Sequence, residues 1–314
     1  MNAPRAAQHI NLFHGSPMSV LSSCLRGMIR AAPGCDLLAA DYANIEGRGL
    51  AWLAGEDWKL DAFRAYDAGT GPDLYKVSAH RIYGTPVADV TKDQRQIGKV
   101  AELACGYQGG VGAFQRMAQT YLVKVADELA DTIKTKWREA HPATVAYWYD
   151  LETACYAAVS TPGAVLTAGA RGRQVAFRVK GSFLWCKLPS GRVLCYPYPK
   201  MKPVETPWGE IKDQVHYMHV DGLSNKWVET HTYGGKLAEN VTQAICRDLL
   251  AYSIRQAEDA GYPVVLHVHD EVVAEVPKGF GSLEEFEEIC ARTPAWADGL
   301  PVVTEGWRGE RYRK

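Results

Sequence analysis

The stretch His267-Val-His-Asp-Glu-Val-Val-Ala-Glu-Val276 places two adjacent carboxylates, Asp270 and Glu271, between two runs of strand-forming residues. β-Branched residues on both sides of a short polar interruption predict a hairpin with the acids at its tip. A carboxylate on a stiff hairpin tip is well placed to bind a divalent metal ion. The ordinary alternative is that both acids are solvated turn residues, as most acids between strands are.

A second candidate acid, Asp41, ends another apolar run, Leu37-Leu-Ala-Ala-Asp41. The run predicts a strand, and the residues after it predict a helix that ends near Gly55. Asp41 therefore belongs to a junction between a strand and a helix. If folding brings this junction to the acidic hairpin, the distant carboxylates can complete one metal site.

A third pattern predicts a helix over residues 92–107, with Thr91 as its N-cap and Gly109-Gly110 after its end. Residues at intervals of four share one stripe of this helix: Arg95, Lys99, Leu103 and Tyr107. On an ordinary charged helix the cations would be solvated and the other side chains would belong to the core. Glycines at positions 98, 106, 109 and 110 instead indicate that something approaches the backbone closely.

The other patterns predict an irregular lead-in over residues 1–20, with order beginning near Leu21, and a helix-compatible segment at 22–29. Further helices are predicted at 58–66, 74–83 (N-cap Asp73), 115–138, 145–159, 236–258 and 283–290. Strands are predicted at 175–179, 183–185 and 193–196. Residues 203–235 predict a loop with short strands, and residues 301–307 a short tail.

Composition is that of an ordinary globular protein: 314 residues, 47% hydrophobic and 23% charged. No apolar run approaches the ~20 residues that a membrane span needs, and the first residues lack a signal-peptide layout, so we expect a cytoplasmic protein. The 8 cysteines are scattered without a CxxC pair, which predicts reduced thiols. A net charge of -1 means that any DNA contact requires a local basic surface.

One chemistry explains an acid after a strand, a cationic helix stripe and an acidic hairpin. In two-metal phosphoryl transfer, carboxylates hold two Mg²⁺ ions ~3.5–4 Å apart, one activating the attacking hydroxyl and one stabilising the leaving oxygen. Arginine and lysine on a helix would hold a triphosphate, where charge grows in the transition state.

At these residues the sequence resembles family A DNA polymerases, the bacterial DNA polymerase I and related phage enzymes. Asp41-Tyr-Ala-Asn-Ile-Glu-Gly-Arg48 looks like the family's motif A, Arg95-Gln-Ile-Gly-Lys99 with Tyr107 like motif B, and His269-Asp-Glu271 like motif C. Order and wide spacing both match, over about residues 21–314. The resemblance implies an α+β fold in which a polymerase palm (21–56 and 161–314), an antiparallel sheet with helices, carries a helical fingers subdomain (57–160).

The resemblance also assigns catalytic roles. Asp41, Asp270 and the main-chain carbonyl of Tyr42 would ligate two Mg²⁺ ions, with Glu271 assisting nearby. Arg95 and Lys99 would bind the phosphates of the incoming nucleotide, and Lys99 would also protonate pyrophosphate.

Further roles concern the rest of the nucleotide and the DNA. Glu46 would be the steric gate against a ribose 2′-hydroxyl, and Tyr107 would pack near the templating base. His269 would touch the primer end. Weaker candidates for DNA contact are Arg26, Gln243 and Arg192, of which Gln243 could equally be an exposed helix residue and Arg192 a turn residue.

The sequence departs from the family's pattern in several places. Leu103 stands where an aromatic usually stacks on the incoming base, so stacking should be weaker there. Tyr75 stands where a His often lies near the phosphates, and His267 replaces a polar amide. The thumb and the proofreading exonuclease have no counterpart, which predicts weak, salt-sensitive DNA binding, low processivity and a separate chain that supplies the missing part.

The expected function is therefore a DNA-directed DNA polymerase that adds dNTPs to a primer 3′-OH on primer-template DNA, in replication. One alternative is a degenerate polymerase that binds primer-template DNA or a replication partner without chemistry. Another is a two-metal nuclease, which would share the carboxylates but gain nothing from the stripe. The presence together of Asp41, Asp270, Glu46, Arg95 and Lys99 favours the polymerase.

Overall fold

The computed structural model describes residues 9–11, 16–205 and 209–313. These residues form two compact units. Unit 1 contains the described residues within Met1–Ala43, Leu250–Arg292 and Val302–Lys314, and unit 2 contains those within Asn44–Leu249 and Thr293–Pro301. Compactness alone does not test the predicted palm and fingers boundaries, which stay a prediction.

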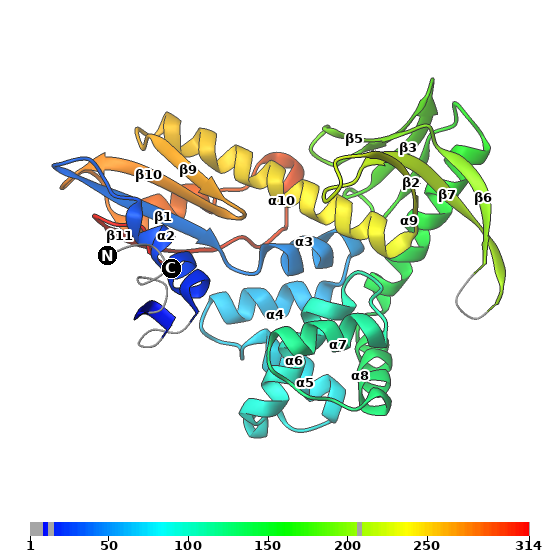
Figure 1. Cartoon of the computed structure of the whole chain (residues 1–314), viewed down its shortest axis with the longest axis horizontal. Helices are drawn as coiled ribbons and strands as arrows, with labels where there is room; N and C mark the ends of the chain where they lie inside the picture. Colours follow the sequence, from blue (N-terminus) through cyan, green and yellow to red (C-terminus); the bar gives the residue numbers. More distant parts are fainter. Residues whose placement is uncertain (1–8, 12–15, 206–208, 314) are drawn as a thin grey trace. The chain divides into compact units, whose positions relative to one another are not determined.

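Unit 1 is built on a four-stranded antiparallel sheet in the order β11-β1-β10-β9 (Figure 1). Its strands are β1 (Cys35–Tyr42), β9 (Val264–Val268), β10 (Glu271–Pro277) and β11 (Thr304–Gly309). The hairpin predicted around Asp270 and the strand predicted before Asp41 are thus confirmed.

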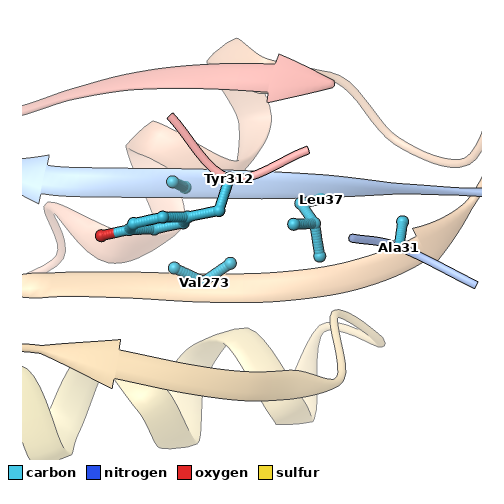
Figure 2. Packing of buried hydrophobic residues seen from close by; sticks show 5 residues of the cluster. Ala31, Leu37, Val273 and Tyr312 are labelled. Atoms are coloured by element: carbon cyan, nitrogen blue, oxygen red, sulfur yellow. The ribbon is translucent and has the colours of Figure 1, made fainter. Parts of the chain in front are cut away.

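The apolar run of β1 is continuous because both faces of the sheet are covered. On one face Leu37 packs with Ala31, Val273 and Tyr312 (Figure 2). Helix α11 (Leu283–Cys290) also packs on β1 and β11. Ser282 caps this helix by accepting a hydrogen bond from the Glu285 N–H.

Two predictions for unit 1 are wrong. The irregular lead-in was expected to reach residue 20, but helix α2 (Pro17–Met28) begins earlier, because proline is favoured in the first turn of a helix. The tail after Pro301 contains a strand, β11, because the edge of β1 offers it a partner. Residues 1–8 and 12–15 of the predicted lead-in lie outside the described residues.

The helices of unit 2 follow one another along the chain from the end of β1 to strand β2 (Figure 1). They are α3 (Ile45–Ala54), α4 (Asp57–Asp67), α5 (Leu74–Tyr83), α6 (Lys92–Cys105), α7 (Val111–Thr120), α8 (Asp127–Ala140) and α9 (Pro142–Ser160). The predicted caps are confirmed: Asp73 accepts from the Tyr75 N–H, and Thr91 forms a capping box with Gln94. The continuous helical pattern over 115–138 is wrong, because the chain turns between α7 and α8 with Leu122 in a left-handed conformation (φ 57°).

Two antiparallel sheets complete unit 2, in the orders β2-β3-β4-β5 and β6-β7-β8. The first contains β2 (Leu166–Ala168), β3 (Val175–Lys180), β4 (Phe183–Lys187) and β5 (Val193–Pro197). The second contains β6 (Lys200–Glu205), β7 (Ile211–Val220) and β8 (Trp227–Thr232). The strands predicted within the loop over 203–235 are thus confirmed, but they pair in a regular sheet that was not predicted. Strand β7 buries Val215 and Tyr217 in alternation, a short pattern that the surrounding turn residues obscured.

Helix α10 (Gly234–Asp259) begins in unit 2 and ends in unit 1. It confirms the helix predicted over 236–258. The chain therefore has the predicted α+β class, with antiparallel sheets and a helical segment. Among the residues that the structure describes, no helix is both long enough and apolar enough to cross a bilayer.

Candidate functional site

The fold of unit 1 gathers the three predicted acids at one end of its sheet. In the β1–β10 ladder Asp41 lies directly opposite Glu271. The Tyr42 N–H donates a hydrogen bond of 3.1 Å to the Asp270 carbonyl. His269 and Asp270 form the two-residue turn between the paired residues Val268 and Glu271. His269 has a positive φ of 53°, as tight hairpin turns require.

Glu271 is held from the side by Tyr312. Residues directly opposite in an antiparallel pair project to the same face, so Asp41 and Glu271 share a face of the sheet. Glu271 is 1% exposed, and burial together with the hydrogen bond to Glu271 raises the pKa of Tyr312 to about 12. The tyrosine hydroxyl therefore stays protonated and donates to the carboxylate. Arg26, a predicted DNA contact, lies with its guanidinium 6.0 Å from the centre of the Tyr312 ring.

The side chain of Tyr42 belongs to the core of unit 1. Its hydroxyl contacts Ser253 and donates to the Cys290 carbonyl at 3.1 Å. The Tyr42 side chain thus points into the core, and metal ligation by its main-chain carbonyl stays a prediction.

The chemistry of these donors fits Mg²⁺, which prefers oxygen ligands and keeps several water molecules. Within the described part of the chain, no group of three or more His, Cys, Asp and Glu residues has the geometry of a ready-made metal site. A Mg²⁺ site here would consist of the Asp41 and Asp270 carboxylates and the Tyr42 carbonyl, with substrate or water oxygens as the remaining ligands.

In unit 2 the two cations of the α6 stripe both lie near one aromatic ring. The Arg95 guanidinium and the Lys99 ammonium lie 5.3 and 6.0 Å from the centre of the Tyr75 ring. Arg95 also pairs with Asp73, and Lys99 lies 4.5 Å from the Tyr121 ring centre. The partners Asp73 and Tyr121 were missed, because nothing in the local sequence links them to the stripe.

Glycine in α6 serves the packing of the protein's own helices. A Cβ atom on Gly98 would lie 2.2 Å from the Tyr75 carbonyl oxygen, so α5 and α6 touch through their backbones. A Cβ on Gly106 would lie 3.2 Å from Leu50. The close approach that these glycines indicated is therefore present, and at both positions the approaching group is the chain itself.

Glu46 and Tyr107 form one hydrogen-bonded pair beside a small cavity. The Tyr107 hydroxyl donates to Glu46 Oε2 at 2.9 Å. Burial and the adjacent Glu46 carboxylate raise the pKa of Tyr107 well above its usual value, so the hydroxyl remains a donor. Both side chains line a cavity of about 70 Å³ together with Leu103, which is 37% exposed, and Tyr75.

The other predicted DNA contacts have different environments. Arg192 is fixed against α10, where it pairs with Asp248 and donates to the Ala244 carbonyl at 2.7 Å. Gln243 is exposed on the same helix. His269 is exposed at its turn.

Known proteins resemble this chain along most of its length. Residues 8–178 match the family described as DNA polymerase family A. The DNA polymerase of Bacillus phage SP02 is 38% identical over 310 residues, which cover 97% of this chain and 45% of that protein. DNA polymerase I of Pseudomonas aeruginosa is 36% identical over 105 residues, 31% of this chain and 11% of that protein. The chain thus spans less than half of these relatives.

A solved structure has a similar fold. The POL domain of Pol1 from M. smegmatis, in complex with DNA primer-template and dNTP, superposes with a TM-score of 0.56 and 18% identity. The superposition covers 92% of this chain and 42% of that one. At this identity the likeness concerns the fold alone.

Proposed function

Because the chain belongs to DNA polymerase family A, we propose that it is a template-directed DNA polymerase module that adds dNTPs to a primer 3′-OH during replication. The observation that supports this most is the register of unit 1. It places Asp41 opposite Glu271 and ties Tyr42 to Asp270, although about 230 residues separate the two motifs.

Two Mg²⁺ ions would be held by Asp41, Asp270 and the Tyr42 carbonyl. When bound, they supply activation of the primer hydroxyl and stabilisation of the charge on the leaving pyrophosphate. Glu271 is buried and hydrogen-bonded to Tyr312, so its role is to position the neighbouring acids and keep the local charge negative.

Arg95 and Lys99 would bind the phosphates of the incoming nucleotide. Arg95 now pairs with Asp73, so a phosphate would take over part of the guanidinium that the carboxylate holds. Lys99, an ammonium beside two aromatic rings, would give its proton to pyrophosphate as it leaves.

Glu46 would exclude a ribose 2′-hydroxyl, with its orientation fixed by the Tyr107 hydroxyl. Leu103 offers the incoming base an apolar surface without ring stacking. His269, Gln243, Arg192 and Arg26 would contact primer-template DNA. The separate chain that would supply further DNA contacts stays a prediction, which processive extension by the purified chain alone would contradict.

Primer extension with Mg²⁺ and all four dNTPs tests the proposal. Asp270→Asn keeps the shape of the side chain and removes its charge, so we expect template-dependent extension to be lost. Asp259→Asn, at the exposed end of α10, is the matched control and should extend the primer as the wild type does. Degradation of the primer would indicate a nuclease instead, and DNA binding without either reaction would indicate a degenerate polymerase.

A further inference from the structure

The sheet β2-β3-β4-β5 of unit 2 has one buried and one outward face. Side chains alternate along β3 and β4, and the inward set is buried: Val175, Phe177, Leu184 and Cys186. Strands β2 and β3 pack on α9. The opposite set, Ala176, Arg178, Lys180, Phe183, Trp185 and Lys187, forms what we term the outer face of β3–β4. None of the proposed catalytic or nucleotide-binding residues belongs to it.

Cations and aromatic rings alternate across this outer face. In the β3–β4 register Arg178 lies opposite Trp185, and Lys180 lies opposite Phe183. The Phe183 ring is 5.5 Å from the Trp185 ring and 6.4 Å from the exposed Tyr198 ring, measured between ring centres. Each of these two aromatic rings, Phe183 and Trp185, thus lies next to a cation on the adjacent strand.

Two hollows make the outer face concave. One, of about 740 Å³, is lined by Val165, Trp185 and three cations, Arg178, Lys180 and Lys187. The other, of about 640 Å³, is lined by Trp296, Asp298, Arg171 and Arg173. Ala176 and Lys187 line both, so the two hollows adjoin, and we term them together the groove.

The groove carries a strong excess of positive charge. Five cations line it, Arg171, Arg173, Arg178, Lys180 and Lys187, against one carboxylate, Asp298. Within the described parts of the chain, no salt bridge forms to Arg178, Lys180 or Lys187. By contrast, Lys200 and Lys202 on the neighbouring sheet share Glu229. A chain of net charge -1 therefore concentrates unneutralised positive charge on this face.

We propose that the groove is a binding site for single-stranded DNA. Its charge complements a row of phosphates. Trp185 in the groove, with Phe183 beside it on the outer face, offers rings on which unpaired bases stack. A single strand can use both the cations and the rings, because its bases are unpaired and free to stack. A duplex presents mainly its phosphates. An acidic polypeptide would match the charge but would leave the rings without flat partners. The inference goes beyond the proposed function and requires no catalysis.

Binding of a fluorescently labelled dT12 oligonucleotide, measured by anisotropy in EDTA without dNTPs, tests the site apart from polymerase activity. Trp185→Ala should weaken binding by about tenfold or more through lost stacking, and Trp185→Phe should retain most of the affinity. Arg178→Ala with Lys180→Ala should lower the slope of log affinity against log salt by about 1.4, since each single-strand phosphate contact contributes about 0.7.

The matched control is Lys226→Ala with Trp227→Ala, a lysine and an exposed tryptophan at the β7–β8 turn outside the groove. This variant should bind dT12 as the wild type does, and circular dichroism should show every variant folded. The proposal is overturned if the groove variants bind dT12 normally, or if Trp185→Ala weakens binding of a 12-base-pair duplex equally. It is also overturned if polyglutamate competes as well as unlabelled dT12, since that result would indicate an acidic protein partner. Loss of primer extension with these binding results intact would count against the proposed function alone.

Discussion

Glu102 joins α6, the helix with the cationic stripe, to its neighbouring helices, and replacing it with Gln is expected to destabilise unit 2. Its side chain is 5% exposed and pairs with Lys59. Glu102 Oε1 accepts from Ser78 at 2.5 Å and from Trp137 Nε1 at 3.0 Å, and lies 3.3 Å from His141 Nε2. One carboxylate thus joins residues of α4, α5, α6 and α8 and the residue that precedes α9.

The size of the destabilisation follows from the buried Lys59 charge that Glu102→Gln leaves without its anion. Gln preserves the volume and can still accept a hydrogen bond, but the Lys59 ammonium, 4% exposed, loses its anion. Breaking one side of a buried ion pair costs about 3–5 kcal/mol. Asp131→Asn is the matched control, because Asp131 pairs with Lys134 at the surface and should matter by less than about 1 kcal/mol.

The same contacts give a pH dependence. Burial by itself raises the pKa of Glu102, but the nearby Lys59 and His141 outweigh it and hold the pKa far below its usual range. A depressed folded-state pKa means that the stabilisation is complete above the unfolded-state pKa of about 4.3 and is lost as pH falls further. Acidification from about pH 5 should therefore lower the free energy of unfolding of the wild type more than that of Glu102→Gln.

Urea unfolding followed by tryptophan fluorescence measures both effects, since Trp137 is part of the cluster. At pH 7 the variant should have the lower free energy of unfolding, and the difference should narrow as the pH falls below about 4. Equal urea midpoints for the variant and the wild type at pH 7 would refute the reasoning. So would a difference that is independent of pH.

Three further substitutions test other parts of the molecule. Glu46→Ala removes the proposed gate and the acceptor of Tyr107, so incorporation of ribonucleotides relative to deoxyribonucleotides should rise by about tenfold or more in primer extension. Gly98→Ala would place a methyl group 2.2 Å from the Tyr75 carbonyl oxygen and should lower the free energy of unfolding in urea by about 1–3 kcal/mol. Gly112→Ala is the control, because its methyl group would lie 3.7 Å from the nearest neighbouring atom and should leave the protein's stability unchanged or higher. Tyr312→Phe keeps the ring in its hydrophobic cluster and removes the hydroxyl from Glu271. We expect a free energy of unfolding about 1 kcal/mol lower and a higher Mg²⁺ concentration for half-maximal primer extension. An unchanged Mg²⁺ dependence would contradict the positioning role of Glu271.

Elements with local signals were predictable from the sequence. Asp73 and Thr91 cap helices where the sequence placed them, and the β-branched runs around Asp270 form the expected hairpin. Local signals act between residues a few positions apart, so one sequence contains them completely. The meeting of Asp41 with the hairpin is not a local signal, and it was expected from the family resemblance.

Elements that depend on a distant partner were not predictable. Strand β11 contains Gly306 and Gly309, which weaken a strand by themselves, and it forms because the edge of β1 is available. A Cβ on Gly306 would lie 2.2 Å from the Ala39 carbonyl, so glycine there permits the close pairing. The sequence shows the glycine but not the strand that approaches it.

Side-chain roles divide in the same way. The stripe of α6 could be derived from a period of four. The surroundings of the charged residues of α6 could not: Arg95 pairs with Asp73 just before α5, while Glu102, outside the stripe, is buried. A charged residue in a helix gives no local sign of which of these it will be, because burial is decided by elements far along the chain. The outer face of β3–β4 is the converse case. Its strands were predicted from the sequence, yet only the cross-strand register, which sets Arg178 opposite Trp185, brings the scattered cations and rings onto one surface.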